Sequence, residues 1–282
     1  MVGKAEVHVS VRLGALGDGV ETLRAAGVEA MNALPTWHVD LLARKAISAD
    51  DVVGAGVMLV LEDAADAHTR NVPLVATALA FLAQADDGLL YRLTLSAPEV
   101  LLTLRSGYRI FQRMTGPAIV RQMLEEAGTT GDRLALRLSG HYGMRPSTTQ
   151  YGETDWQFFE RLCAEEGISY WFDATGSGPV LVLGDDTASH DGIEGGTTIP
   201  FEDPSQRVRP RAFFSLEVAE ELAADAVVLR DYDVRHPDVL IEGACGEGGR
   251  EVYEYPAPSV PMTRETALSG NLCAEGRRLG PR

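Results

Sequence analysis

Side chains able to carry out chemistry include adjacent acidic residues, of which the pairs at 50–51, 86–87, 165–166 and 185–186 are examples. A glycoside hydrolase needs two carboxyl groups that face each other across about 5 to 10 Å, and neighbouring positions in a sequence do not establish that geometry. Turns and solvated faces account for acidic neighbours of this kind, and segment 185–188 lacks the alternating pattern of a calcium-binding loop. We therefore expect no catalysis from the pairs Asp50-Asp51, Asp86-Asp87, Glu165-Glu166 and Asp185-Asp186.

The histidines show no spacing that is typical of a metal site. The sequence contains no His-x-x-x-His, and no histidine stands at a ligand spacing from a cysteine. His190 precedes Asp191 within a loop rich in Gly, Asp and Thr, and His236 precedes a proline, as at a strand end. We expect structural or solvent-exposed roles for all six histidines, which are His8, His38, His68, His141, His190 and His236.

Ser177 and the glycine-rich segment 243–249 also fail to match catalytic motifs. Ser177 has a glycine on each side, but not at the Gly-x-Ser-x-Gly spacing of a nucleophile elbow, so a hairpin loop accounts for it. Segment 243–249 lacks the Gly-x-Gly-x-x-Gly spacing of a dinucleotide site, and we expect a flexible loop there. The residues therefore predict no catalytic, cofactor-binding or metal-binding site, no cofactor and no enzyme activity.

Composition and charge exclude further classes of function. The 282 residues include 25 basic and 41 acidic side chains, which gives a net charge of −16 and a pI near 4.8. An acidic surface repels phosphate backbones and anionic lipids, which disfavours nucleic-acid binding. No apolar stretch approaches the roughly 18 residues of a membrane span, and no signal peptide is evident, so we expect synthesis in the cytoplasm. The cysteines are odd in number and widely spaced, so we expect Cys163, Cys245 and Cys273 to be reduced and structural.

The first 96 residues are patterned mainly as β-strands. Residues 7–13 alternate apolar and polar side chains, which places four apolar side chains on one face of a sheet. The turn signal Asp86-Asp87-Gly88 predicts a hairpin. Because strands recur at short intervals, we expect a barrel or a sandwich. The expected strands are 7–13, 57–61, 74–81 and 91–95.

Helix signals enter after residue 96. Pro98 begins a short helix that extends to Leu104. Thr115 is the expected N-cap of a second helix, which Gly128 ends. The apolar stripe of this second helix comprises Ile119, Val120, Met123, Leu124 and Ala127.

A third helix is marked by a capping box, in which Thr154 and Gln157 satisfy free backbone groups reciprocally. Its expected core residues are Trp156, Phe159, Leu162 and Cys163, and Gly167 ends it. A hairpin of residues 168–172 and 180–183 follows, and then a connector rich in proline and arginine. Further strands are expected at 213–218, 227–234 and 239–241, and a helix at 268–279.

Several blocks of residues match one protein family in the same order along the chain. The most recognisable block comprises 151–156, 159–162 and 165–172, and residues 108–112 and 117–126 precede it. Further matches are 91–95, 101–105, 230–237 and 253–256. The match is dense from about residue 90 to 184 and thinner beyond. Together these blocks resemble the VgrG spike proteins of type VI secretion systems.

The resemblance implies a fold and an assembly. The family is similar to the baseplate hub of contractile phage tails, which implies two barrel-like β domains with an α/β insertion and a homotrimer. Three such protomers would form a pseudo-sixfold ring that stacks on a hexameric tube protein. We therefore predict an α+β, mainly β, fold with a first barrel-like domain at 1–96, an insertion at 97–203 and an incomplete second barrel-like domain at 204–282. Full members continue into a neck and a needle, and the chain is expected to stop before them.

The function implied by the resemblance is structural, in a type VI secretion system or a related contractile injection machine. The implied partners are other copies of the chain, an Hcp-like hexameric tube protein, other baseplate proteins and secreted effectors, without nucleic acid or a membrane span. The protein would assemble in the cytoplasm and be exported by the machine. Two alternatives remain open: an adaptor or effector-loading module that reuses the insertion without trimerising, and an unrecognised hydrolase, which would need a clustered acid–base pair.

Overall fold

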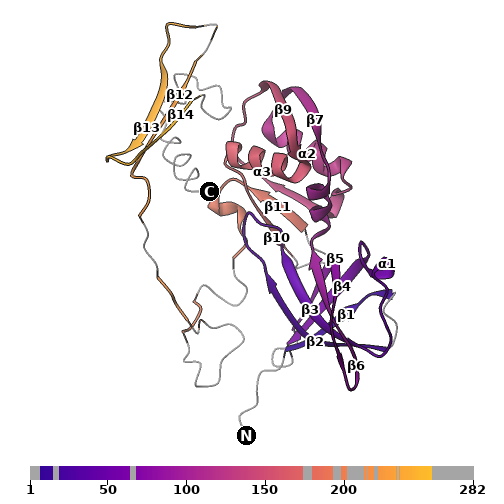
Figure 1. The fold of residues 1–282 in the computed structure, drawn as a ribbon. Helices are drawn as coiled ribbons and strands as arrows, with labels where there is room; N and C mark the ends of the chain where they lie inside the picture. Colours follow the sequence, from indigo (N-terminus) through magenta and orange to yellow (C-terminus); the bar gives the residue numbers. More distant parts are fainter. Residues whose placement is uncertain are drawn as a thin grey trace. The chain divides into compact units, whose positions relative to one another are not determined.

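The computed structural model describes residues 7–14, 19–63, 68–173, 180–192, 198–201, 213, 215–218, 222–232, 234 and 236–255. These residues form two compact units. One unit contains strands β1–β6, β8, β10 and β11, and the other contains β7, β9, helix α3, most of helix α2 and strands β12–β14 (Figure 1). The predicted domain boundaries at 96/97 and 203/204 stay predictions, and the second of them lies outside the described residues.

Six antiparallel strands of the first unit form a sheet that nearly closes into a barrel (Figure 1). Their order is β1-β4-β5-β6-β3-β2, and the two end strands β1 and β2 also lie next to each other. The short helix α1 (Ala49–Val52) lies between β3 and β4 in the chain. The strands are β1 (Val7–Arg12), β2 (Val20–Val28), β3 (Thr36–Ala43), β4 (Gly56–Asp63), β5 (His68–Ala85) and β6 (Gly88–Ser96).

The barrel core explains which strands could be predicted. All four strands expected before residue 97 are confirmed, and Ala85 pairs with Gly88 across the expected hairpin turn. Strands β2 and β3 were not expected. In β2 most side chains are exposed, so the strand lacks a regular apolar alternation. The fully buried side chains Val39, Leu41, Leu59, Leu93 and Leu95 form the centre of the core.

A three-stranded sheet in the same unit has the order β10-β11-β8. Strands β10 (Ser169–Asp173) and β11 (Val180–Gly184) form the expected hairpin, whose loop lies outside the described residues. Strand β8 (Leu134–Arg137) runs parallel to β11. The turn after β2 is bonded to β10, because the Asn32 N–H donates to the Tyr170 carbonyl (2.8 Å) and the Tyr170 N–H donates to Asn32 Oδ1 (2.9 Å).

Short helical segments flank these sheets. The helix expected after Pro98 forms as the 3-10 helix η2 (Pro98–Leu104). Two further 3-10 turns, η3 (Gly131–Arg133) and η4 (Thr187–Ser189), precede β8 and follow β11.

The second unit contains an antiparallel ribbon and two helices. Strands β7 (Ser106–Met114) and β9 (Arg145–Thr154) pair with each other, and neither was expected as a strand. Helix α2 (Gly116–Glu126) confirms the second expected helix, and Ala118 N–H donates to Thr115 Oγ1 (3.3 Å) at its start. Its predicted stripe is buried except for Ala127, which is exposed because α2 has already ended there.

Helix α3 (Asp155–Glu166) has the local structure that the sequence predicts. Gln157 N–H donates to Thr154 Oγ1 (3.1 Å), and Thr154 N–H donates to Gln157 Oε1 (2.9 Å), which completes the capping box. Gly167 ends the helix with a left-handed backbone (φ 71°). The four predicted core residues are buried, and Phe158 is buried as well.

The capping box gives a first testable prediction. Thr154→Ala should lower the free energy of unfolding by about 1 kcal/mol, because the Gln157 N–H loses its acceptor at the first turn of α3. Urea unfolding followed by far-UV circular dichroism measures the change. Thr154→Ser keeps the hydroxyl and should stay within a few tenths of a kcal/mol of the parent, so equal losses in both variants would contradict the capping role.

A separate three-stranded sheet lies near the C-terminal end of the described residues. Its order is β13-β12-β14, with β12 (Ala226–Asp231), β13 (Ile241–Gly246) and β14 (Glu251–Glu254). The strand expected at 227–234 is therefore confirmed as β12, whereas the strand expected at 239–241 begins only at Ile241. The strand expected at 213–218 is wrong for the described residues, where Phe213 makes one isolated bridge with Phe201. The helix expected at 268–279 lies outside the described residues.

Two further sequence expectations need correction. The glycine-rich segment at 243–249 is not a loop throughout, because Gly243–Gly246 form the second half of β13 and pair with β12. Cys245, in this strand, is joined in a disulfide, so the expectation that all three cysteines are reduced is wrong for it. In the described part of the chain, no helix is long and apolar enough to cross a membrane.

Candidate functional site

The ribbon of β7 and β9 presents one buried face and one exposed face. Phe111, Thr148 and Gln150 lie on the buried face, where the Phe111 ring stacks on Phe158 of α3 with ring centres 5.7 Å apart. The strand register places Arg109 opposite Gln150 on this same face. The alternation of the two strands therefore directs both polar and apolar side chains toward α3.

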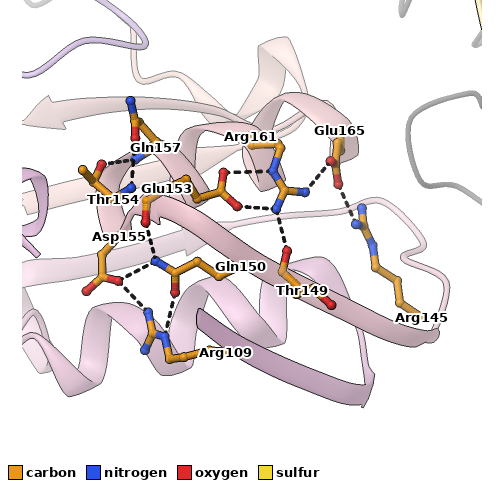
Figure 2. Close-up of polar contacts among 10 residues, drawn as sticks. All are labelled: Arg109, Arg145, Thr149, Gln150, Glu153, Thr154, Asp155, Gln157, Arg161 and Glu165. Carbon is orange, nitrogen blue, oxygen red and sulfur yellow. Dashed lines mark hydrogen bonds and ion pairs between the residues drawn. The ribbon is translucent and has the colours of Figure 1, made fainter. Parts of the chain in front are cut away.

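The first polar cluster forms at the start of α3, around Asp155 (Figure 2). The Asp155 carboxylate is 2% exposed and accepts hydrogen bonds from Arg109 Nη2 and Gln150 Nε2, both at 2.9 Å. Arg109 Nε also donates to Gln150 Oε1 (2.7 Å). The positive end of the helix dipole stabilises a carboxylate at the first turn, and the Arg109 guanidinium compensates the charge of Asp155.

The second cluster forms at the end of α3, where Arg145 of β9 contacts Glu165 and Glu166. The three side chains are 5%, 8% and 9% exposed. Arg145 Nη1 lies 2.6 Å from Glu165 Oε2, and Arg145 Nε lies 2.9 Å from Glu166 Oε1. Gly116 makes room for this arrangement, because a Cβ atom there would lie 2.3 Å from Glu166 Oε1.

Arg161 connects the two ends of the network (Figure 2). Its guanidinium donates to both oxygens of Glu153, to Glu165 Oε1 (2.9 Å) and to the Thr149 carbonyl (2.9 Å). The Glu153 carboxylate, and then that of Glu165, raise the pKa of Arg161 above its ordinary value against the opposing effect of burial. Arg161 therefore carries a permanent charge that ties helix α3 to strand β9.

These contacts indicate a structural role for the network. Each carboxylate in it faces at least one guanidinium within hydrogen-bond distance. A general acid or base must reach the proton that it transfers, whereas these carboxylates are largely buried and directed at arginines. What the arrangement can do is fix α3 on the ribbon in one register, since a shift would separate buried carboxylates such as Asp155 and Glu166 from their arginines.

The exposed face of the ribbon carries three large apolar or aromatic side chains beside polar ones. Tyr108, Ile110 and Tyr151 are 71%, 66% and 78% exposed, and the two tyrosine rings contact each other edge to face with centres 5.1 Å apart. Large apolar side chains that gather on a surface are typical of contact surfaces. Tyr108 and Tyr151 belong to the sequence blocks that carry the family resemblance.

These four acidic pairs lie in different elements of the fold. Asp50-Asp51 are in α1, Asp86-Asp87 form the β5–β6 turn, and Glu165-Glu166 contact Arg145. Asp185-Asp186 follow β11, where the Ala188 N–H bonds to Asp186 and lowers the pKa of that carboxyl. The structure thus assigns a turn, a cap, a short helix and a salt-bridge network to the pairs.

The histidines and cysteines do not cluster either. His190 stacks on Trp171 with ring centres 4.3 Å apart, and His38 contacts Thr94 Oγ1. Burial, with the charges of two nearby glutamates, raises the pKa of the Cys163 thiol, so this cysteine is a protonated core residue. Across the described ranges, no three His, Cys, Asp or Glu side chains form a group that could hold a metal ion. Ser177 lies outside the described residues.

Sequence reasoning missed the salt-bridge network. The partners Arg109 and Asp155 are 46 positions apart, and Arg145 and Glu165 are 20 positions apart, so no local pattern joins them. The available signal was indirect: Arg161 and Glu165 stand four positions apart, a spacing that places both on one face of a helix.

Comparison with known proteins identifies relatives along nearly the whole chain. The family model "Phage tail baseplate hub (GPD)" matches residues 28–279. The type VI secretion system spike protein VgrG4b of Pseudomonas aeruginosa is 30% identical over 98% of this chain, and the match covers 35% of that protein. The spike protein VgrG5 of the same organism is 29% identical over 94% of this chain and 34% of its own length. The chain therefore spans about a third of the length of the curated relatives it matches.

Solved structures show the same fold. The Escherichia coli c3393 protein, described as a type VI secretion component similar to the T4 tail proteins gp27 and gp5, superposes with a TM-score of 0.60. It is 22% identical, and the match covers 80% of this chain and 56% of that one. These similarities confirm the predicted mainly β, hub-like fold and the resemblance to VgrG proteins.

Proposed function

The chain belongs to the phage tail baseplate hub family, and from this we propose that it is a structural hub or spike component of a type VI secretion system or a related contractile injection machine. In this proposal three copies form a ring that caps the hexameric inner tube and is delivered with the tube on contraction. The match of the hub family over residues 28–279, at about 30% identity to spike proteins, carries the proposal.

The symmetry of the proposed assembly explains how one chain adapts to a hexamer. A ring of three chains with two barrel-like units each presents six similar surfaces, which resolves the mismatch between threefold and sixfold symmetry. Three copies would bring together a charge of −48, three times −16. Association therefore requires contact surfaces that carry few charges, or partners of opposite charge.

The packing within the second unit supports a mechanical rather than a catalytic role. Helix α3 is fixed to β9 by Arg145 and Arg161, whose partners are carboxylates within 3.1 Å. A body delivered by contraction must transmit force without rearranging, and buried charge-assisted hydrogen bonds favour one arrangement. The proposed partners are other copies of the chain, the Hcp-like tube protein, further baseplate proteins and effectors. Assembly would take place in the cytoplasm before export.

Absolute mass by light scattering tests the proposal, with the chain alone and mixed with the inner-tube protein from the same source. A mass of three chains that increases when the tube hexamer is added is the expected result. Trimers that form only when the tube protein is added would support the hub role and show that trimer formation depends on the tube. A monomer that ignores the tube would contradict the hub role and favour the adaptor that reuses the insertion without trimerising.

A further inference from the structure

Strand β5 extends well beyond its neighbour β4. Residues from His68 to Val75 pair with β4 on one side, whereas β6 pairs with β5 from Val75 to Ala85 on the other. Within the described ranges, β6 is therefore the one strand paired with residues 77–85 of β5 (Figure 1). Among the described strands, these nine residues of β5 thus have a partner on one side, and the other side is called the open edge.

Ala76 shows which backbone groups face this edge. Its N–H donates to the Ala55 carbonyl (3.0 Å) and its carbonyl accepts from the Gly54 N–H (2.8 Å), so both groups point to the β4 side. Beyond Ala76, backbone groups alternate between the two sides, and the bulges at 76/78 and 81/83 each add one residue on the β6 side. The backbone groups of Leu79, Phe81 and Gln84 therefore point away from β6.

The open edge lacks the features that normally protect an edge strand. Residues 77–85 contain no charged side chain and no proline, and the uncharged stretch extends back to Asn71 in a chain of net charge −16. Phe81 and Leu82 are 57% and 46% exposed. Natural sheets blunt exposed edges with lysines, prolines or short strands, so a long, uncharged and apolar edge is a template for pairing with another strand.

We propose that residues 77–85 of β5, on the side where no described strand pairs with them, pair edge to edge with a strand of a second copy of this chain. The inference rests on the proposed trimeric function and names the surface through which copies meet. Charge argues for this occupant, because two chains of −16 can approach only where their surfaces carry few charges, and this edge carries none. Pairing of β5 with a different edge of the next copy is a head-to-tail contact, which can close into a ring.

The test compares Phe81→Pro with Phe81→Ala in the full chain. Both variants remove the phenyl ring, but proline also removes the N–H that faces the open edge and leaves the β6 ladder in place. Light scattering over a dilution series should show that association of Phe81→Pro is weaker than that of Phe81→Ala by about tenfold or more. Gln84→Pro against Gln84→Ala repeats the comparison at an exposed position, should Phe81→Pro fail to fold.

Hydrogen exchange gives a second readout. In the associated parent, the amides of Leu79, Phe81 and Gln84 should exchange more slowly than in the dilute monomer. If both proline variants still associate, and exchange at these amides is the same in the associated and monomeric parent, the inference is overturned. The proposed trimer would then form through another surface. If the parent forms a complex of two chains and the proline variants do not, pairing at the β5 edge is supported and the proposed trimer is contradicted. A parent chain that stays monomeric under all conditions would overturn both.

Discussion

Arg145→Ala should lower the free energy of unfolding by about 3–5 kcal/mol, because the buried Glu166 carboxylate loses its guanidinium partner while Glu165 keeps that of Arg161. Arg145 is the residue of β9 that contacts both Glu165 and Glu166, and all three side chains are less than 10% exposed. The cost arises from the Glu166 carboxylate that remains in a site of low dielectric, more than from the lost attraction. Urea unfolding monitored by circular dichroism measures the loss.

Two control variants separate charge from geometry at this site. Arg145→Lys keeps the positive charge but loses the planar fork that reaches both carboxylates, so its stability should lie between those of the parent and Arg145→Ala. Adding Glu166→Gln to Arg145→Ala removes the uncompensated charge and should recover part of the loss. A cost below about 1 kcal/mol for Arg145→Ala would contradict a structural role for the cluster.

The elements that the sequence predicted are those whose signals are local. The capping box of Thr154 and Gln157, the αL stop at Gly167 and the turn before Gly88 each depend on residues within four positions. The network around Arg145 depends instead on the register between β9 and α3, which joins residues about 20 positions apart. Strand pairing and side-chain distance decide that arrangement, and local propensity carries no information about either.

Exposure explains the missed strands. Strand β2 is mostly exposed, and β7 has large apolar side chains on its solvent face, such as Tyr108 and Ile110. Both departures remove the clean alternation of apolar and polar positions from which a half-buried strand is recognised. In β7 the alternation is lost because large apolar side chains lie on the exposed face. On such a face, contact with a partner would determine the residue types more than packing in the chain's own core does.

The proposed hub function has no signature among the chemically reactive residues. A protein that works by assembly uses strand edges and apolar faces, which most residue types can form, so a search of acidic pairs and histidines finds nothing characteristic. The order of several sequence blocks supplied the family, and the family match over residues 28–279 confirmed it. Which surface meets which partner depends on contacts outside a single chain, and it therefore stays a proposal.

Trp156→Ala should also destabilise the second unit by about 3–5 kcal/mol, because it removes a large aromatic side chain from the core. Trp156 lies in the first turn of α3, is 5% exposed, and its ring packs against Phe159 with centres 4.7 Å apart. The truncation leaves a cavity that the rest of α3 can fill only by moving, and α3 is held at its start by Asp155 and at its end by Glu165 and Glu166. Far-UV circular dichroism in urea measures the loss without depending on the fluorescence of the removed indole.

Tyr151→Ala is the matched control for this prediction, because it also truncates an aromatic residue but at a position that is 78% exposed. Its cost should be about 1 kcal/mol, from the edge-to-face contact with Tyr108. Trp156→Phe keeps an aromatic ring beside Phe159 and should cost less than Trp156→Ala. Equal losses for Trp156→Ala and Tyr151→Ala would mean that the helix face at Trp156 is not part of the core, whereas a difference of about 2 kcal/mol or more places the stability of α3 on its buried aromatic face.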